Sequence, residues 1–118
     1  MSDSCKIVKK GEVFWADLGE CEGHVQSGNR PVLVLGNAAA NRFSSVVTIL
    51  PISTKVEKLH AIPTHVLLKS ALSRDSIVLT EQIRTIPKEH LLGGCIYRLT
   101  SNEQSAVDKA LLKQLGIA

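Results

Sequence analysis

The apolar residues of this chain come in short runs, which limits it to a fold built from short strands. Residues 31–35 form one continuous apolar run, and residues 46–52 are rich in β-branched side chains. Runs of this length and composition are typical of strands buried on both faces. Further strand-like segments lie at residues 12–18, 64–68, 76–79 and 95–99, and residues 80–86 extend or follow the third of these.

Only one segment has a clear helical period, and it lies near the C-terminus. The predicted helix begins at Ser101, which forms a capping-box pattern with Gln104, and it ends before Gly116. Its apolar face carries Val107, Ala110, Leu111 and Leu115. Residues 38–43 predict a single helical turn, and residues 87–92, which begin at a proline, predict one or two.

The order of these elements indicates a single small domain over residues 1–118. A chain of this length buries enough surface to fold without disulfides or a structural metal. Residues 1–8 predict a flexible lead-in. Short strands with irregular loops, followed by a terminal helix, predict a mainly β (α+β) fold, a small curled sheet or barrel with short helices at its rim.

Composition and charge exclude several classes of protein. Cys5, Cys21 and Cys95 are an odd number at irregular spacing, which argues against a disulfide framework, and no zinc-ligand spacing is present. We therefore expect reduced thiols, no metal and no cofactor. No apolar run is long enough to be a signal segment or a membrane span, so we expect a cytoplasmic protein with no membrane partner. The net charge of +3 suits a polyanionic partner but does not identify one.

Polar residues lie at the ends of the predicted strands in three places. Arg30 follows the glycine-rich loop 19–29 and precedes a buried strand, so it can stand at the mouth of a cleft or form an ion pair at its rim. Ser53 and Thr54 end another strand, where their hydroxyls can face the same cleft or only serve the backbone of a turn. The polar residues in segment 81–85 can read base edges, line a subunit interface or form a solvated face.

The four histidines offer a different chemistry, since a pair of histidines can cleave RNA by acid–base catalysis. They are His24, His60, His65 and His90. Nothing in their spacing pairs them, and for His65 a structural hydrogen bond is the favoured interpretation.

Five motifs taken in order resemble the MazF/PemK toxins of type II toxin-antitoxin systems. They are KGEVFWADL at residues 10–18, GNRPVLVLGN at 28–37, NRFS at 41–44, PTHV at 63–66 and DSIVLTEQIRTI at 75–86. Each motif alone is weak, but five in this order between residues 9 and 115 are specific. The sequence is most similar to the EndoA-like type of Gram-positive bacteria.

The resemblance implies a small SH3-like (CcdB/PemK-like) β-barrel with a C-terminal helix, working as a homodimer. It also implies an mRNA interferase, an endoribonuclease that cuts single-stranded RNA without a metal and leaves 2′,3′-cyclic phosphate and 5′-hydroxyl ends. UACAU is a candidate target sequence. A MazE-type antitoxin is expected to lay an extended tail over the active sites.

The family's functional residues carry over by motif. Arg30 takes the place of the catalytic arginine. Ser53 stands where the family usually has a catalytic threonine, with Thr54 as a substitute. The resemblance implies RNA-binding roles for Phe14, Gln26, Ser27, Asn29, Thr64, His65 and Gln82, and a dimer-interface role for Arg84. One departure is that Val25 precedes Gln26 where many relatives have an acidic residue, so individual loop contacts do not transfer directly.

Two other classes of protein fit a barrel of this size. One is a CcdB-like toxin that binds gyrase, and the other is a non-catalytic RNA-binding or SH3-like adaptor module. Metal-free RNA cleavage that depends on Arg30 and Ser53 separates both from a nuclease. A peptide-binding adaptor would usually have an aromatic-lined groove, and the chain has only one Trp, one Tyr and two Phe.

Overall fold

The computed structural model describes residues 6–21, 23, 25–69 and 71–118, and it contains seven strands and two α-helices. The strands are β1 (Glu12–Asp17), β2 (Asn29–Val34), β3 (Val46–Ser53), β4 (Val66–Leu68), β5 (Ser76–Val78), β6 (Arg84–Pro87) and β7 (Leu91–Arg98). The α-helices are α1 (Ala38–Phe43) and α2 (Ser101–Gln114). Three short 3₁₀ helices are η2 (Val56–Lys58), η3 (Thr80–Gln82) and η4 (Lys88–His90).

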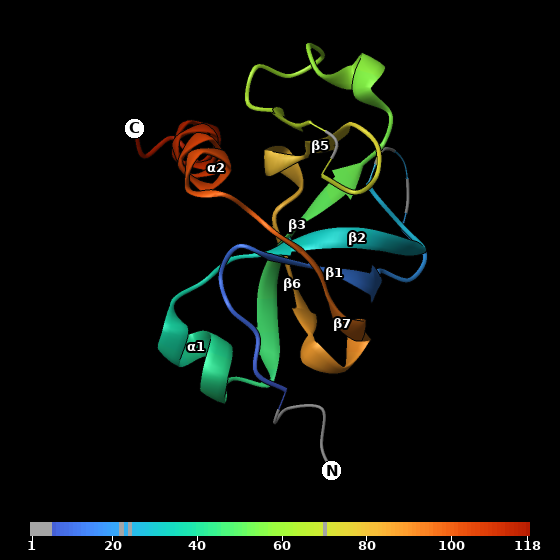
Figure 1. Cartoon of the computed structure of the whole chain (residues 1–118), viewed down its shortest axis with the longest axis vertical. Helices are drawn as coiled ribbons and strands as arrows, with labels where there is room; N and C mark the ends of the chain where they lie inside the picture. The colour runs from blue at the N-terminus through green and yellow to red at the C-terminus, as the bar shows by residue number, and fades with distance from the viewer. Residues whose placement is uncertain (1–5, 22, 24, 70) are drawn as a thin grey trace.

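The strands form one antiparallel sheet in the order β4-β5-β3-β2-β1-β7 (Figure 1). One edge of β3 pairs with β2, and the other edge pairs first with β6 and then with β5. The predicted mainly β fold with a C-terminal helix is therefore confirmed. The sheet is not a closed barrel, because β4 and β7 end the path without pairing to each other in the described part of the chain.

The core lies on both faces of the sheet. Because successive residues of a strand point to opposite faces, β1 and β2 supply side chains to two clusters. One cluster contains Val8, Phe14, Ala16, Leu18, Val32, Val34, Val47, Ile49, Ile86 and Leu91. The other contains Val13, Leu33, Leu35, Leu50, Ile52, Leu68, Val78 and Val107. The run at residues 31–35 is apolar at every position because both of its faces are buried, as predicted.

The end of the predicted flexible lead-in packs against the domain. Val8 is only 2% exposed and belongs to the first core cluster. Lys6 Nζ donates hydrogen bonds to the carbonyl oxygens of Leu91 (3.2 Å) and Gly93 (2.8 Å). Residues 6–8 are therefore part of the packed domain, which corrects the prediction there, and residues 1–5 lie outside the described residues.

The segment that follows β6 differs from the prediction. The helical turn predicted within residues 87–92 forms as the short η4, and β7 begins directly after it and continues through Gly93 and Gly94. Pairing with β1 shifts within β7, so Phe14 alone lies opposite residues 93–96. Gly93 has a φ of 69°, a conformation that glycine adopts without steric cost, so the glycines allow a bulge within a strand.

Helix α2 begins at Ser101 as predicted, but its capping box lies one residue earlier than expected. Thr100, and not Ser101, is the N-cap, with its hydroxyl accepting from Glu103 N (3.2 Å). The Glu103 carboxylate in turn accepts from Thr100 N (2.9 Å) and from the Tyr97 hydroxyl (2.7 Å). Because Tyr97 also holds the Glu103 carboxylate, the capping box forms between Thr100 and Glu103 and not between Ser101 and Gln104. Gly116 follows the helix at a φ of 73°, as predicted.

None of the helices in the described residues has both the length and the apolar character needed to cross a membrane. The longest is α2, whose outer face is exposed to solvent and whose buried residue is Val107.

Candidate active site

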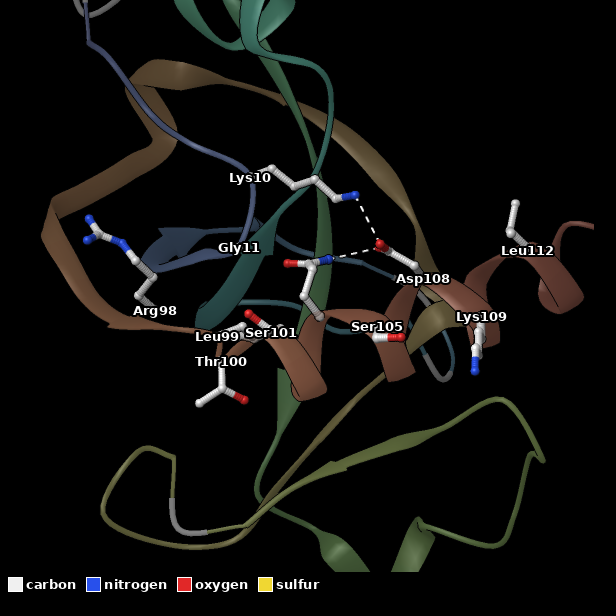
Figure 2. Close-up of a pocket in the computed structure, with 11 residues that line it drawn as sticks. Lys10, Gly11, Arg98, Leu99, Thr100, Ser101, Ser105, Asp108, Lys109 and Leu112 are labelled. Atoms are coloured by element: carbon white, nitrogen blue, oxygen red, sulfur yellow. Dashed lines mark hydrogen bonds and ion pairs between the residues drawn. The ribbon is translucent and has the colours of Figure 1, made fainter.

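A hollow of about 520 Å³ lies beside the start of α2. Lys10 and Gly11 line one side and Arg98 lines another. Figure 2 shows the Lys10 ammonium directed at Asp108, at 3.2 Å, and Gln104 Nε2 donates to the same carboxylate at 2.9 Å. The charges of Lys10 and Asp108 neutralise one another, and no site residue predicted from the sequence lines this hollow.

Two groups near this hollow hold their protons more strongly than usual. The hydrogen bond from Arg98 Nη2 to Glu12 (2.7 Å) raises the pKa of the guanidinium. The hydrogen bond from the Tyr97 hydroxyl to Glu103 raises the pKa of that phenol, with burial adding to the effect. Both groups therefore stay protonated near neutral pH.

A second pocket forms because the hydrogen-bond ladder between β2 and β3 ends early. The bond from Leu35 N to Thr48 O (2.9 Å) indicates that odd-numbered residues of this segment direct their backbone groups toward β3. Pro31, four residues before Leu35, therefore also directs its backbone toward β3, but a proline has no N–H to donate. Pairing accordingly stops at Val32 and Pro51, and the two strands part beyond that point (Figure 1).

The opening between the strands holds a pocket of about 310 Å³. Residues from β1, β2, the end of β3 and the β4–β5 connection line it: Trp15, Asn29, Arg30, Pro31, Ile52, Thr54, Leu72 and Arg74. Two of these side chains are guanidinium groups and none is a carboxylate. A pocket with this lining favours an anionic ligand.

Arg30 lies at the rim of this pocket, as its position between a loop and a buried strand predicted. Its side chain is exposed, and its Nε donates to the carbonyl oxygen of Ser27 (3.1 Å). Within the described residues this is the bond that holds the guanidinium. The two terminal nitrogens therefore keep their donors for a ligand. A planar guanidinium can bind two oxygens of one phosphate at once.

The two candidate hydroxyl groups have different surroundings. Thr54 is half-buried and lines the pocket with Arg30. Ser53 is 3% exposed and does not line the pocket, and its Oγ accepts from Lys55 N (3.1 Å). The pairing of β2 with β3 ends at Val32 and Pro51, and Ser53 pairs instead with Ile77 of β5.

Three of the predicted RNA-binding residues, Gln26, His65 and Gln82, line another pocket of about 240 Å³. Gln82 Oε1 accepts from Gln26 N (2.8 Å), which ties the glycine-rich loop to η3. His65 Nε2 lies 2.9 Å from Glu81 Oε1, and the His65 side chain is 4% exposed. The favoured interpretation of His65, a structural hydrogen bond, is therefore confirmed.

The remaining predicted residues are spread over the molecule. Asn29 lines the pocket of Arg30, and Ser27 supplies the carbonyl that holds it. The Thr64 hydroxyl donates to Gln114 in α2 (2.6 Å). Arg84 Nη1 donates to the Cys21 thiol of the chain's own loop (3.4 Å).

Phe14, His60 and His90 line neither of these two pockets. Phe14 is 3% exposed within the core, and the Lys6 ammonium lies 5.2 Å from its ring centre. A base therefore cannot stack on this ring in the described conformation. His60 and His90 are exposed, and His24 lies outside the described residues.

Two residues of the Arg30 pocket were not predicted from the sequence. Trp15 is 45% exposed, and its neighbour Phe14 is buried, so strand alternation alone could have shown that the indole faces away from that cluster. Arg74 has no such local signal, because only the packing of the β4–β5 connection brings it to the pocket. Among the described residues, no three His, Cys, Asp or Glu side chains gather in a group able to hold a metal ion.

Comparison with known proteins places this fold and sequence in one family. The PemK-like, MazF-like toxins of type II toxin-antitoxin systems match residues 9–115. Endoribonuclease EndoA of Bacillus subtilis (strain 168) is 40% identical over 114 residues, covering 94% of this chain and 97% of that protein.

Solved structures share the fold at lower sequence identity. MazF from Deinococcus radiodurans superimposes with a TM-score of 0.79 at 23% identity, covering 94% of this chain and 98% of that one. A mycobacterial endoribonuclease, solved in complex with its cognate antitoxin, gives a TM-score of 0.72 at 24% identity, covering 97% and 96%. Since the family match spans nearly the whole chain and a relative is 40% identical along it, this chain belongs to the PemK-like, MazF-like toxins of type II toxin-antitoxin systems.

Proposed function

We propose that this protein is a sequence-selective endoribonuclease that cleaves single-stranded mRNA in the pocket between β2 and β3. The observation that carries the proposal is Arg30, an exposed guanidinium with free terminal donors in a pocket that no carboxylate lines. Membership of the toxin family and the 40% identity to a protein named endoribonuclease support the same activity.

The proposed reaction uses the nucleophile that RNA itself carries. The 2′-oxygen bonds to the adjacent phosphorus as its proton leaves, and the bond from phosphorus to the 5′-oxygen breaks as that oxygen gains a proton. The products have a 2′,3′-cyclic phosphate and a 5′-hydroxyl end. Because no activated water is needed as nucleophile, this step does not require a metal.

Arg30 is proposed to stabilise the negative charge that builds on the non-bridging oxygens of the phosphate. Donors held in place where charge develops lower the barrier more than donors that must reorganise. Free arginine has a pKa above ~12, so binding and orientation suit this side chain better than proton transfer.

Ser53 is the hydroxyl that we propose acts with Arg30, and Thr54 is the alternative. The Ser53 oxygen already accepts from Lys55 N, which orients the group and leaves its proton to donate. We expect Ser53→Ala to lower the cleavage rate about 10- to 100-fold, the effect of losing one hydrogen bond to a charged group. Thr54→Ala should change the cleavage rate less than about threefold, because in this proposal it removes no hydrogen bond to the charged phosphate.

Single-turnover cleavage of a labelled RNA by both variants measures this difference. Ser53→Thr is the matched variant, because threonine restores the hydroxyl and is the usual residue of the family at this position. A Thr54→Ala variant that loses more activity than Ser53→Ala would transfer the role to Thr54.

Partners and target follow from the same proposal. Gln26, His65 and Gln82 line another pocket, and we propose that Gln26 and Gln82 contact base edges of an unpaired strand there, whereas His65 is held by Glu81. We propose UACAU as the target sequence, a MazE-type antitoxin as the inhibitor, a homodimer as the active form and the cytoplasm as the place of action. Sequencing of cleaved RNA ends identifies the target, and analytical ultracentrifugation gives the oligomeric state.

Cleavage in the presence of EDTA tests the function itself. Purified protein should cut a single-stranded RNA with EDTA present and leave ends that carry a 2′,3′-cyclic phosphate. The absence of cleavage, together with inhibition of gyrase, would favour the CcdB-like alternative. RNA binding without cleavage would favour the non-catalytic module.

A further inference from the structure

The pocket of Arg30 contains two side chains to which the proposed reaction gives no role, Trp15 and Arg74. Both are exposed and both line the opening between the separated strands. An RNA strand that places one phosphate at Arg30 must pass over neighbouring surface, and these two side chains form part of that surface.

The backbone of Arg74 is fixed while its side chain is free to bind. Ser73, just before it, has a φ of 69°, which is unusual for a residue other than glycine and marks a tight turn. The Ser76 hydroxyl donates to the carbonyl oxygen of Arg74 (3.3 Å), which anchors the turn at the start of β5. Within the described residues no partner is found for the Arg74 guanidinium, so its donors are available to a ligand.

Trp15 presents a large aromatic surface from a rigid position. It lies inside β1, paired with Pro31 of β2 on one side and Leu92 of β7 on the other. Its neighbour Phe14 is 3% exposed, whereas Trp15 is 45% exposed. An indole held by two flanking strands and left open to solvent is suited to stacking on a flat ring.

Guanidinium groups beside an exposed aromatic ring are the combination that binds single-stranded nucleic acid. The cations contact the backbone phosphates, and each base stacks on an aromatic face, whatever its identity. An acidic segment of a protein would satisfy the two arginines but would not need the indole. The pocket therefore fits a phosphate-linked nucleobase better than a carboxylate.

Resting on the proposed function, we propose that Arg74 binds the phosphate next to the one held by Arg30, and that Trp15 stacks on the base between these two phosphates. Arg74 and Trp15 are then positioning residues that hold the RNA in register without touching the reacting atoms. Stacking tolerates every base, so this contact adds affinity and register, and base selection is left to the pocket of Gln26, His65 and Gln82.

Trp15 is the only tryptophan of the chain, so its fluorescence reports directly on this pocket. The probe is a short single-stranded RNA whose 2′-hydroxyl at the cut site is replaced by hydrogen, which prevents cleavage. Binding of this RNA should quench the emission of the wild-type protein. Arg74→Ala should weaken Kd about tenfold and lower the slope of log K against log salt by about 0.7, the value for one phosphate contact on a single strand.

Lys113→Ala is the matched control, because it removes the same unit of charge from the exposed end of α2. It should leave Kd and the salt slope close to the wild-type values. If Arg74→Ala behaves like Lys113→Ala, or if RNA binds by anisotropy without changing the Trp15 emission, the assignment is wrong. Quenching by an acidic peptide but not by RNA would assign the pocket to a protein partner and would also overturn it.

Steady-state cleavage separates positioning from catalysis. Arg74→Ala and Trp15→Ala should raise KM about tenfold and leave kcat near the wild-type value, because each removes binding made equally in the ground and transition states. Trp15→Phe should restore most of the affinity, since a smaller aromatic ring still stacks.

The failure of this inference and the failure of the proposed function give different results. A wild-type protein that cleaves RNA while Arg74→Ala and Trp15→Ala keep normal KM values would refute the positioning roles only. A wild-type protein that binds the RNA with quenching but never cleaves it would refute the nuclease and leave the positioning roles supported.

Discussion

Arg30→Ala is expected to lower the rate of RNA cleavage by about 10² to 10³, the usual loss when one charge-stabilising donor is removed from an active site. The side chain is exposed, and the bond from its Nε to Ser27 O holds it within the described structure. Removing it therefore leaves no buried group without a partner, and the variant should fold as the wild type does. Single-turnover cleavage of a labelled RNA, with enzyme in excess, measures the chemical step.

Two further variants show whether the guanidinium itself is needed. Arg30→Lys keeps the charge but loses the planar pair of donors, so its rate should fall between those of the wild type and Arg30→Ala. Arg42→Ala removes an exposed arginine in α1, whose guanidinium lies 5.6 Å from the Phe43 ring centre, and should cut RNA at the wild-type rate. A folded Arg30→Ala protein with normal cleavage would remove the basis of the proposed function.

Lys88→Ala is expected to lower the free energy of unfolding by about 3–5 kcal/mol, the range for emptying a large buried site and orphaning a charged hydrogen bond. Lys88 is fully buried, at 0% exposed. Its ammonium donates to the carbonyl oxygen of Asn41 near the end of α1, and its backbone N donates to Ser45 O (2.9 Å). The two hydrogen bonds of Lys88 therefore link α1 and the residues after it to the segment where β6 leads into β7. A domain of this size is stable by only about 5–15 kcal/mol, so the loss should be easily seen.

Urea unfolding, with Lys88→Met beside Lys88→Ala, separates the two causes of this loss. Methionine fills most of the volume but leaves the carbonyl without its donor, so Lys88→Met should lose about 1–3 kcal/mol. Lys113→Ala, at an exposed position, should stay within about 0.5 kcal/mol of the wild type. A Lys88→Ala protein as stable as Lys113→Ala would show that the contact between α1 and the sheet does not depend on this lysine.

Much of the fold could be predicted because the signals are local. The apolar run at residues 31–35 predicted a strand buried on both faces, and the structure has it between two core clusters. The helical period predicted α2 and its start at Ser101, and only the capping box was placed one residue too late. Two capping patterns overlap there, and the Glu103 carboxylate also accepts from the Tyr97 hydroxyl, which lies outside both patterns. The helical turn predicted within residues 87–92 forms as η4, but β7 begins earlier than predicted, at Leu91, because its pairing with β1 is a long-range contact.

The candidate site could be predicted only in part. Arg30 stood out because it lies between a loop and a buried strand, and Pro31 after it explains where the two strands separate. Trp15 and Arg74 share the pocket with Arg30 only because β1 and the β4–β5 connection pack there. The sequence also suggested Phe14 as a surface for RNA, whereas the structure buries it in the core.

By itself, the sequence determined where most strands and the terminal helix form, since hydrophobic period acts within a few residues. Only the tertiary structure decided which distant side chains meet. His65 lies beside Glu81, and Lys88 reaches a carbonyl at Asn41, through strand pairings that no local pattern encodes. A lysine is ordinarily read as exposed, and here the packing of α1 against the sheet buries it.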